Sequence, residues 1–306
     1  MAVTAAMVKE LRERTGAGMM DCKNVLVETD GDMDKAIDLL REKGLAKAAK
    51  KAGRIASQGL VKLAFSADGK KASAIEVNSE TDFVAKNADF QAFCANVAKT
   101  VADENPADMP ALMAAKCAGG EFTVEEVLRE KVLTIGENLS VRRFYRTDKP
   151  AVTYIHGGGR IGVVVELETE AKIEGKLLEM GKDVCMQIAA MNPQYLSKET
   201  VDASVIESEK NILIAQIKND PKMANKPDAI IEKMVGGRIG KFYENNCLMQ
   251  QAFVKDGNMS VEKYIASVAA EIGTSVKVVN FTRFEKGEGL EKRQDDFAAE
   301  VASMTK

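Results

Sequence analysis

Residues with catalytic potential are few in this chain of 306 residues, and the most suggestive string is His156 followed by three glycines. An HGGG string forms part of the oxyanion hole in some esterases, where backbone amides stabilise a negatively charged intermediate. Such enzymes also need a nucleophilic serine on a G-x-S-x-G turn, and the sequence has no such motif. Because His156 is also the sole histidine, the sequence disfavours a hydrolase and predicts that the protein is not an enzyme.

A second suggestive stretch, NSETDFVAKN, covers residues 78–87 and combines two carboxylates with an aromatic ring. Glu80 and Asp82 are close enough in sequence to suggest a divalent-cation site, but carboxylates in one loop more often face solvent or cap a helix. Phe83 lies between Asp82 and Lys86 in a predicted loop. The ring either closes a core, holds a substrate or contacts a partner, and these ten residues leave the three roles open.

Composition and charge exclude several classes of function. A net charge of -3 and a pI near 5.6 offer no basic surface for phosphate backbones, so nucleic acid is not predicted as a direct ligand. No apolar run is long enough for a signal peptide or a membrane span, so we expect a cytoplasmic protein. The sequence has no phosphate-binding glycine loop and no paired metal-ligand spacing, so no cofactor and no metal are predicted.

The five cysteines are widely separated and include no C-x-x-C pair. This spacing gives little support to disulfides or zinc and favours buried free thiols. The positions concerned are Cys22, Cys94, Cys117, Cys185 and Cys247.

Helical periodicity predicts three short helices in the N-terminal fifty residues, with Asp32 as the N-cap of the third and Gly44 as its end. Met19 and Met20 follow a glycine turn between the first two helices. Their flexible thioethers could form an apolar patch for a partner, but from the residues alone a place in the core ranks slightly ahead. The lysine- and alanine-rich run after Gly44 is typical of a helical or flexible link.

Alternating apolar residues then predict a β-hairpin, with strands around Val61–Phe65 and Ser73–Val77 joined at Asp68-Gly69. The NSETDFVAKN loop leads from this hairpin into a helix capped by Asn87. Pro106 and Pro110 are expected to break the helical pattern. Thr123 and Glu126 have the spacing of a capping box for a helix that ends at Ile135-Gly136, and a third strand is predicted from Leu139 to Tyr145.

The same order of elements recurs in the second half of the chain. A hairpin through residues 152–167 turns at the three glycines, a helix follows, and a later strand covers residues 276–284. The segments Ile135–Phe144 and Ile272–Phe281 both read Ile-Gly, a polar turn and alternating positions, which predicts two related α+β subdomains. The string GGRIG occurs in this hairpin and again at residues 236–240, where the surrounding pattern is helical.

A long insertion interrupts the second half. Two apolar stripes, separated by the turn sequence NDPKMANKP, predict an antiparallel helical hairpin. Such a hairpin packs either on its own domain or on a second copy of the chain as a dimerisation arm, and the sequence leaves both open. The first stripe consists of Val205, Ile206, Ile212, Leu213 and Ile217. Residues 296–304 predict a terminal amphipathic helix.

Three segments together resemble the bacterial elongation factor Ts family. They are VKELRERTGAGMMDCK at residues 8–23, EVNSETDFVAKN at residues 76–87 and HGGGRIGVVVEL at residues 156–167. The likeness runs through the whole chain in order, including the helical insertion and the tail. It implies a nucleotide exchange factor for the GTPase elongation factor Tu, with no bond-making chemistry of its own.

The resemblance also implies an α+β architecture in several modules. These are a ubiquitin-associated-like three-helix module and linker over residues 1–55, one core subdomain over residues 56–145, a second over residues 146–196 and 244–286, a coiled-coil hairpin over residues 197–243 and a C-terminal helical module over residues 287–306.

By the same resemblance, Thr81, Asp82, Phe83 and Val84 form a segment that intrudes near the partner's magnesium site and disturbs it. Six further residues match positions of the family's contact surface: Arg12, Met19, Met20, Ile135, Gly136 and His156. This assignment moves the two methionines from the core to a partner patch. The chain departs from the usual family pattern in the glycine-rich run that follows His156.

Two other classes of function stay open on the sequence alone. A ubiquitin-associated-like adaptor would bind through Met19 and Met20 without the core, and an esterase built on the HGGG string would hydrolyse a generic ester. Neither gives Phe83 a role.

Overall fold

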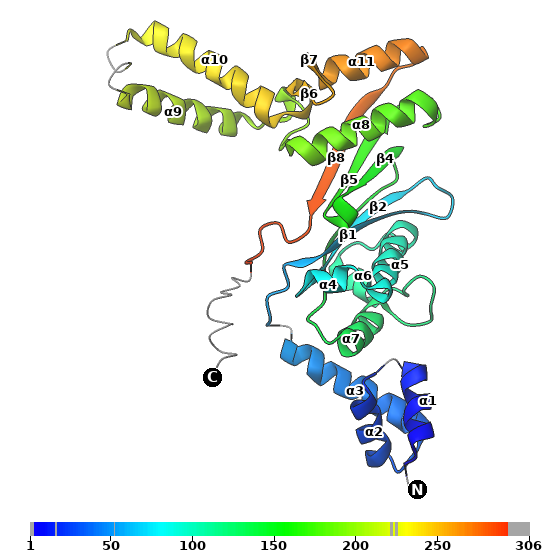
Figure 1. Cartoon of the computed structure of the whole chain (residues 1–306). Helices are drawn as coiled ribbons and strands as arrows, with labels where there is room; N and C mark the ends of the chain where they lie inside the picture. The colour runs from blue at the N-terminus through cyan, green and yellow to red at the C-terminus, as the bar shows by residue number, and fades with distance from the viewer. Residues whose placement is uncertain (1–2, 16, 52, 221–222, 224–225, 293–306) are drawn as a thin grey trace. The chain divides into compact units, whose positions relative to one another are not determined.

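The computed structural model describes residues 3–292 apart from residues 16, 52, 221–222 and 224–225. Helices and strands both occur throughout the described chain, and the strands form small separate sheets, so the predicted α+β class is confirmed (Figure 1). The described chain divides into two compact units. The first holds residues up to Thr147 with Gly157–Gly162 and the segment from Phe284 onward, and the second holds Asp148–His156 and Val163–Arg283.

The N-terminal region forms the helices α1 (Ala5–Thr15), α2 (Met19–Glu28) and α3 (Met33–Lys51). They bury a small common core that includes Leu11, Cys22, Leu26 and Leu40. Asp32 caps α3 as predicted, since its Oδ1 accepts a hydrogen bond of 3.1 Å from the amide of Lys35.

The prediction that this helix ends at Gly44 was wrong, because α3 continues to Lys51. Gly44 is buried where α3 packs on another helix, α7 (Val124–Ile135). A Cβ at Gly44 would lie 3.6 Å from the side chain of Leu133 on α7. Tertiary packing therefore outweighs the loss of about 1 kcal/mol that a glycine brings to a helix interior.

The first unit contains an antiparallel three-stranded sheet in the order β1 (Gln58–Phe65), β2 (Ala72–Ser79) and β3 (Ser140–Thr147). The predicted hairpin and third strand are thus confirmed. Every residue of the central strand β2 is buried. The helix α5 (Ala88–Glu104) packs on this sheet, and Asn87 caps it as predicted by accepting from the amides of Asp89 and Phe90.

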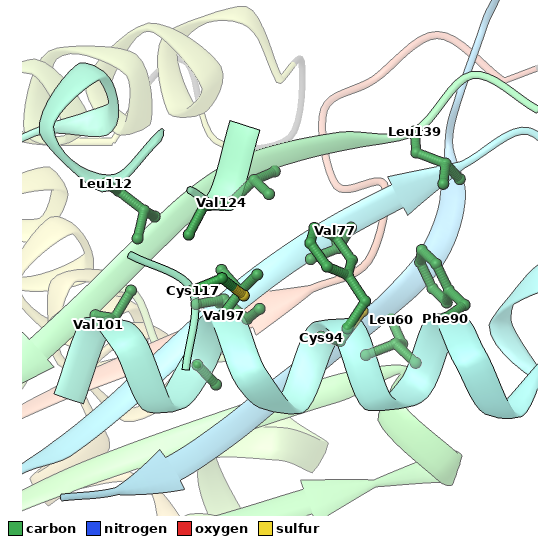
Figure 2. Close-up of a cluster of buried hydrophobic side chains, with 14 of the residues drawn as sticks. Leu60, Val77, Phe90, Cys94, Val97, Val101, Leu112, Cys117, Val124 and Leu139 are labelled. Atoms are coloured by element: carbon green, nitrogen blue, oxygen red, sulfur yellow. The ribbon is translucent and has the colours of Figure 1, made fainter. Parts of the chain in front are cut away.

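Besides the core of the three N-terminal helices, this unit has a larger core between α5 and the sheet (Figure 2). The helix α6 (Met109–Ala114) and α7 complete it. Figure 2 shows Phe90, Cys94, Val97 and Val101 along α5, with Leu112 of α6 and Val124 of α7 among the residues of the same cluster. The residues of the cluster are fully or almost fully buried, so the apolar spacing of the α5 sequence did predict a core-facing helix.

Local capping explains how α6 and α7 begin. The predicted capping box at Thr123 and Glu126 is confirmed, with both reciprocal hydrogen bonds present. The helix α5 ends at Glu104, just before Pro106, as predicted. Pro110 breaks no helix, because it lies in the first turn of α6, which Asp108 caps. A proline is tolerated there because the first helical amides have no intrahelical acceptor.

A second three-stranded sheet has the order β4 (Ala151–His156), β5 (Ile161–Glu168) and β8 (Lys277–Glu285). The predicted hairpin is confirmed, and its turn is formed by Gly157–Gly159, which all have positive φ. The helix α8 (Gly175–Met191) packs on β4. A Cβ at Gly181 would lie 2.5 Å from Val152, so this contact requires a glycine.

The strand predicted over residues 276–284 is confirmed as β8, but the sequence did not predict the elements between the helical insertion and this strand. They are a two-stranded sheet of β6 (Ala252–Phe253) and β7 (Asp256–Ser260) and the helix α11 (Val261–Ile272). Short 3₁₀ turns cover Lys198–Thr200 and Leu248–Gln250.

The insertion forms the predicted pair of helices, α9 (Ala203–Asn219) and α10 (Asp228–Asn246), which lie side by side (Figure 1). They pack through buried apolar residues that include Leu213, Ile217, Val235 and Ile239. Ile212 was wrongly placed in the packing stripe, because its side chain is half exposed on another face of α9. The second GGRIG string lies inside α10, as its helical surroundings predicted.

The terminal amphipathic helix predicted over residues 296–304 lies outside the described residues, as does most of the predicted module over residues 287–306. The described part of that module, up to residue 292, is without a helix or strand.

All five cysteines are buried free thiols, as predicted. Burial raises the pKa of the Cys94 and Cys185 thiols well above the ordinary value. The stability that these neutral thiols contribute is therefore present below the ordinary pKa and is lost as the pH rises toward the folded value.

We expect native protein to react slowly with a thiol reagent such as 5,5′-dithiobis(2-nitrobenzoate) at pH 8, because only an accessible thiolate attacks it. The same protein in urea should release one equivalent of chromophore for each of the five thiols. Rapid labelling of a native thiol would show that its burial opens readily.

Candidate partner-binding site

The segment from Thr81 to Val84 contains one turn of helix, α4 (Asp82–Ala85), where the sequence predicted a loop. Two neighbouring side chains of this turn point in different directions. Val84 is buried and packs in the core of the first unit, whereas the side chain of Phe83 is 77% exposed. Phe83 therefore does not close this core, and of the three roles left open by the sequence, a contact with another molecule fits its exposure best.

An ion pair lies beside the Phe83 ring. The Lys86 ammonium lies 5.7 Å from the ring centroid and forms a salt bridge of 3.1 Å with Asp82. The hydrogen bond and the positive charge of Lys86 lower the pKa of Asp82, so this exposed carboxylate is ionised at neutral pH. An aromatic ring, an anion and a cation are thus presented together on one helical turn.

Ile135 and Gly136 lie where α7 ends, in the same unit. Ile135 is half buried against the core, and it lines a shallow groove together with Phe83 and Val84. Gly136 has a positive φ of 86°, which turns the chain out of the helix at little steric cost. The structure thus brings four predicted site residues, Phe83, Val84, Ile135 and Gly136, into one region of the first unit.

Met19 and Met20 begin α2 and are 59% and 63% exposed. Their alternative place in the core is wrong, since Cys22 and Leu26 of the same helix fill that role. Arg12 is also exposed, on α1. Each of these three side chains is therefore accessible on the N-terminal helices, and the methionine thioethers are flexible apolar groups.

His156 lies at the end of β4 in the second unit and is exposed. Its Nδ1 is 3.1 Å from the hydroxyl oxygen of Tyr154. The three glycines that follow all have positive φ, between 58° and 100°. The backbone of the turn thus accounts for the HGGG string without an oxyanion hole.

The described residues contain no group of three or more His, Cys, Asp or Glu side chains placed to hold a metal ion. Within the same part of the chain, no helix combines the length and the apolar character needed to cross a membrane.

Comparison with known proteins decides the family. The family model described as elongation factor TS matches residues 80–288. A protein of Clostridium perfringens named elongation factor Ts is 52% identical over 305 residues, which cover 99% of each chain. Proteins of the same name are 51% identical in Clostridioides difficile over 306 residues, 99% of each chain, and 48% identical in Syntrophotalea carbinolica over 309 residues, 100% of each chain. This chain belongs to the elongation factor Ts family.

The resemblance predicted from the sequence is therefore confirmed. The matched elongation factor Ts model includes the segment around Phe83, the end of α7 and His156. Arg12, Met19 and Met20 precede it but lie within the nearly full-length matches to the named relatives.

Sequence reasoning missed the side chains that hold the Phe83 segment in place. Glu137 follows the glycine that ends α7, and its carboxylate bonds to the backbone before α4. A carboxylate just after a helix-ending glycine is an available local signal. The sequence alone could not connect it to a segment 56 residues earlier.

Proposed function

We propose that this protein is a guanine nucleotide exchange factor that binds elongation factor Tu with GDP and promotes GDP release during translation elongation. Membership of the elongation factor Ts family supports the assignment. The observation that carries the mechanism is the exposed Phe83 ring, 77% accessible on a helical turn that begins with an ionised Asp82. The protein makes and breaks no covalent bond in this role.

Phe83 would insert into the GTPase domain of the partner near its magnesium site. An aromatic ring suits this task because it is bulky and has few rotatable bonds, so little conformational entropy is lost on insertion. The Asp82 carboxylate would add a negative charge beside Mg²⁺ and phosphate, where it changes the local field strongly. Thr81 and Val84 shape the turn that carries both groups. Displaced Mg²⁺ leaves the phosphates of GDP less well neutralised, so GDP dissociates faster.

The other contact residues would extend this interface. Arg12, Met19 and Met20 supply an exposed surface on the N-terminal helices, and Ile135 with Gly136 adjoins the Phe83 turn. His156 would contact the partner from the second unit.

The modules implied by the resemblance complete the proposal. They are the ubiquitin-associated-like module over residues 1–55, the related core subdomains over residues 56–145 and over residues 146–196 with 244–286, the coiled-coil arm over residues 197–243 and the C-terminal module over residues 287–306. The arm contains the mutually packed helices α9 and α10, and sedimentation of the purified chain would decide whether it also joins two copies.

The proposal predicts that GDP and this protein weaken each other's binding to elongation factor Tu by the same factor, since coupling between two ligands is reciprocal. Stopped-flow release of fluorescent GDP from elongation factor Tu, with and without this protein, measures one side of the coupling. Titration of the protein onto nucleotide-free and GDP-loaded elongation factor Tu measures the other. We expect strong acceleration and a matching loss of affinity for the loaded form.

Absence of acceleration would refute the exchange function. Binding through the N-terminal helices alone, retained after the core is removed, would favour the adaptor instead. Hydrolysis of p-nitrophenyl acetate above the rate in buffer would favour the esterase.

A further inference from the structure

Two loops of the first unit, residues 80–81 and residues 137–138, are joined by reciprocal hydrogen bonds beside the Phe83 turn. Each loop contributes a carboxylate that accepts from the other loop. The Glu137 Oε2 atom accepts hydrogen bonds from the amides of Glu80 and Thr81, at 3.1 and 3.0 Å. Its other oxygen, Oε1, accepts from the Thr81 hydroxyl at 2.6 Å. One carboxylate thus binds three donors on the two residues that precede α4, and hydrogen bonds to a charged acceptor are stronger than neutral ones.

The Glu80 carboxylate makes the opposite connection. Its Oε1 accepts from the amide of Asn138 at 2.6 Å, and its Oε2 lies 2.9 Å from the Arg54 guanidinium. The Asn138 side chain in turn donates to the carbonyl of Arg54 at 2.8 Å. The Glu80 side chain is only 7% exposed, so little water competes for these bonds.

The helix α4 needs this external support. It has four residues, and a helix so short is not stable by itself. Thr81 occupies its N-cap position, but the Thr81 side chain makes no capping hydrogen bond because its hydroxyl is directed to Glu137. Val84 anchors the turn in the core, while the exposed Phe83 ring contributes little to holding it. The direction in which the ring projects therefore depends on the backbone of residues 80 and 81.

We propose that Glu137 is a positioning residue for nucleotide exchange, because it fixes the backbone that presents Phe83. This inference rests on the proposed exchange function. A segment that is ordered before binding loses less conformational entropy when it inserts into a partner. Glu137 acts through Phe83 and need not touch the partner.

The test uses Glu137→Ala and Glu137→Gln in the full-length chain, with Glu125→Ala as the control. The control removes one carboxylate of the same charge at a different place, the first turn of α7. Glu125 pairs with Arg129 on its own helix and makes no hydrogen bond to residues 80–84. The hydrogen bonds from residues 80 and 81 to Glu137 are called the brace below. Hydrogen exchange of the Glu80 and Thr81 amides, followed by mass spectrometry, reports on the brace in the absence of the partner. Loss of one bond to a charged acceptor predicts about tenfold faster exchange at these amides in Glu137→Ala, and an intermediate change in Glu137→Gln.

Stopped-flow GDP release then tests the role in exchange. We expect Glu137→Ala to reduce the acceleration about tenfold. In a Phe83→Ala background the same substitution should have almost no further effect on GDP release, because Glu137 acts only through the Phe83 ring. If the role of Glu137 were purely structural, Glu137→Ala would reduce the acceleration of GDP release by the same factor in the natural and the Phe83→Ala backgrounds. That result would overturn the proposal.

Two further results would also overturn it. Unchanged amide exchange would mean that Glu137 does not hold the segment, and faster exchange with unchanged GDP release would mean that the brace is irrelevant to exchange. Failure of the natural protein to accelerate release would refute the exchange function itself, whereas the amide measurement would still report on the brace.

Discussion

Replacing Phe83 with alanine is expected to reduce the acceleration of GDP release by at least about thirtyfold, the effect of losing an interface anchor worth about 2 kcal/mol. The side chain is 77% exposed in the free protein, so its removal leaves no cavity and should not alter the fold. Any loss of exchange activity therefore reflects a lost contact in the complex and not a change in the free protein. Stopped-flow release of fluorescent GDP at saturating and subsaturating protein concentrations separates a slower maximal rate from weaker binding.

Phe65→Ala is the matched control for this prediction. Phe65 is 41% exposed on β1 of the same unit, and its replacement makes the same chemical change outside the contact residues. We expect Phe65→Ala to keep the acceleration of the natural protein. Equal acceleration by the Phe83 and Phe65 variants would keep the exchange function but assign its mechanism to other groups, with the neighbouring Asp82 the first to test.

Elements whose determinants are close in sequence were predictable. Asn87 bonds to amides two and three residues away, and Thr123 exchanges hydrogen bonds with Glu126. The Asp68-Gly69 turn joins strands whose alternation was clear, and Gly69 has the positive φ that such a turn requires. Local hydrogen bonds of this kind act within a few residues, so the local sequence contains the necessary information.

Features that depend on tertiary contacts were not predictable. Gly44 lies inside a helix because α7 packs against it, although a glycine commonly ends a helix. The spacing of apolar residues also did not show which of them are buried in a core. Met19 and Ile212 are apolar and correctly spaced, yet both are exposed.

The candidate site also has a part that the sequence predicted and a part that it did not. The composition around Phe83 was visible as an anomaly, and the family resemblance supplied its expected role. The brace by Glu137 was not visible, because it joins the end of β2 to the end of α7 across more than fifty residues. Long-range polar contacts of this kind follow from strand register and helix packing, which one sequence does not specify.

Glu76→Gln is expected to lower the free energy of unfolding of the first unit by about 3 kcal/mol, because it removes the charge of a buried and fully paired carboxylate. Glu76 is 0% exposed on β2. It accepts from Arg142 at 3.1 Å and from Arg143 at 2.6 Å. The glutamine would leave both guanidinium groups beside a neutral amide.

A β-bulge explains how two adjacent arginines reach one carboxylate. Neighbouring residues of a regular strand point to opposite faces of the sheet. The pairing of β2 with β3 shifts after Glu76, which is opposite Arg143, while Val77 is opposite Val141. Arg142 is the extra residue of the bulge, and this irregularity lets its side chain share the face of Arg143.

The same carboxylate holds the chain beyond β8. Glu76 accepts from the amide of Gly287 at 2.7 Å, and Arg142 donates to the carbonyl of Glu288 at 2.6 Å. Gly287 has a positive φ, and a Cβ there would lie 2.1 Å from the Ser57 carbonyl oxygen. Only a glycine therefore allows the segment to approach Ser57 so closely. We therefore expect Glu76→Gln also to speed tryptic cleavage after Lys286.

Glu288→Gln is the control, because it neutralises a carboxylate in the same cluster that is 42% exposed and pairs with Arg143 at 3.1 Å. An exposed pair contributes less than about 1 kcal/mol, so this variant should unfold at nearly the natural urea concentration. Urea denaturation followed by circular dichroism measures both losses. Equal midpoints for the two variants would show that burial adds nothing to the Glu76 network, and unchanged cleavage after Lys286 would show that the segment beyond β8 is held by other contacts.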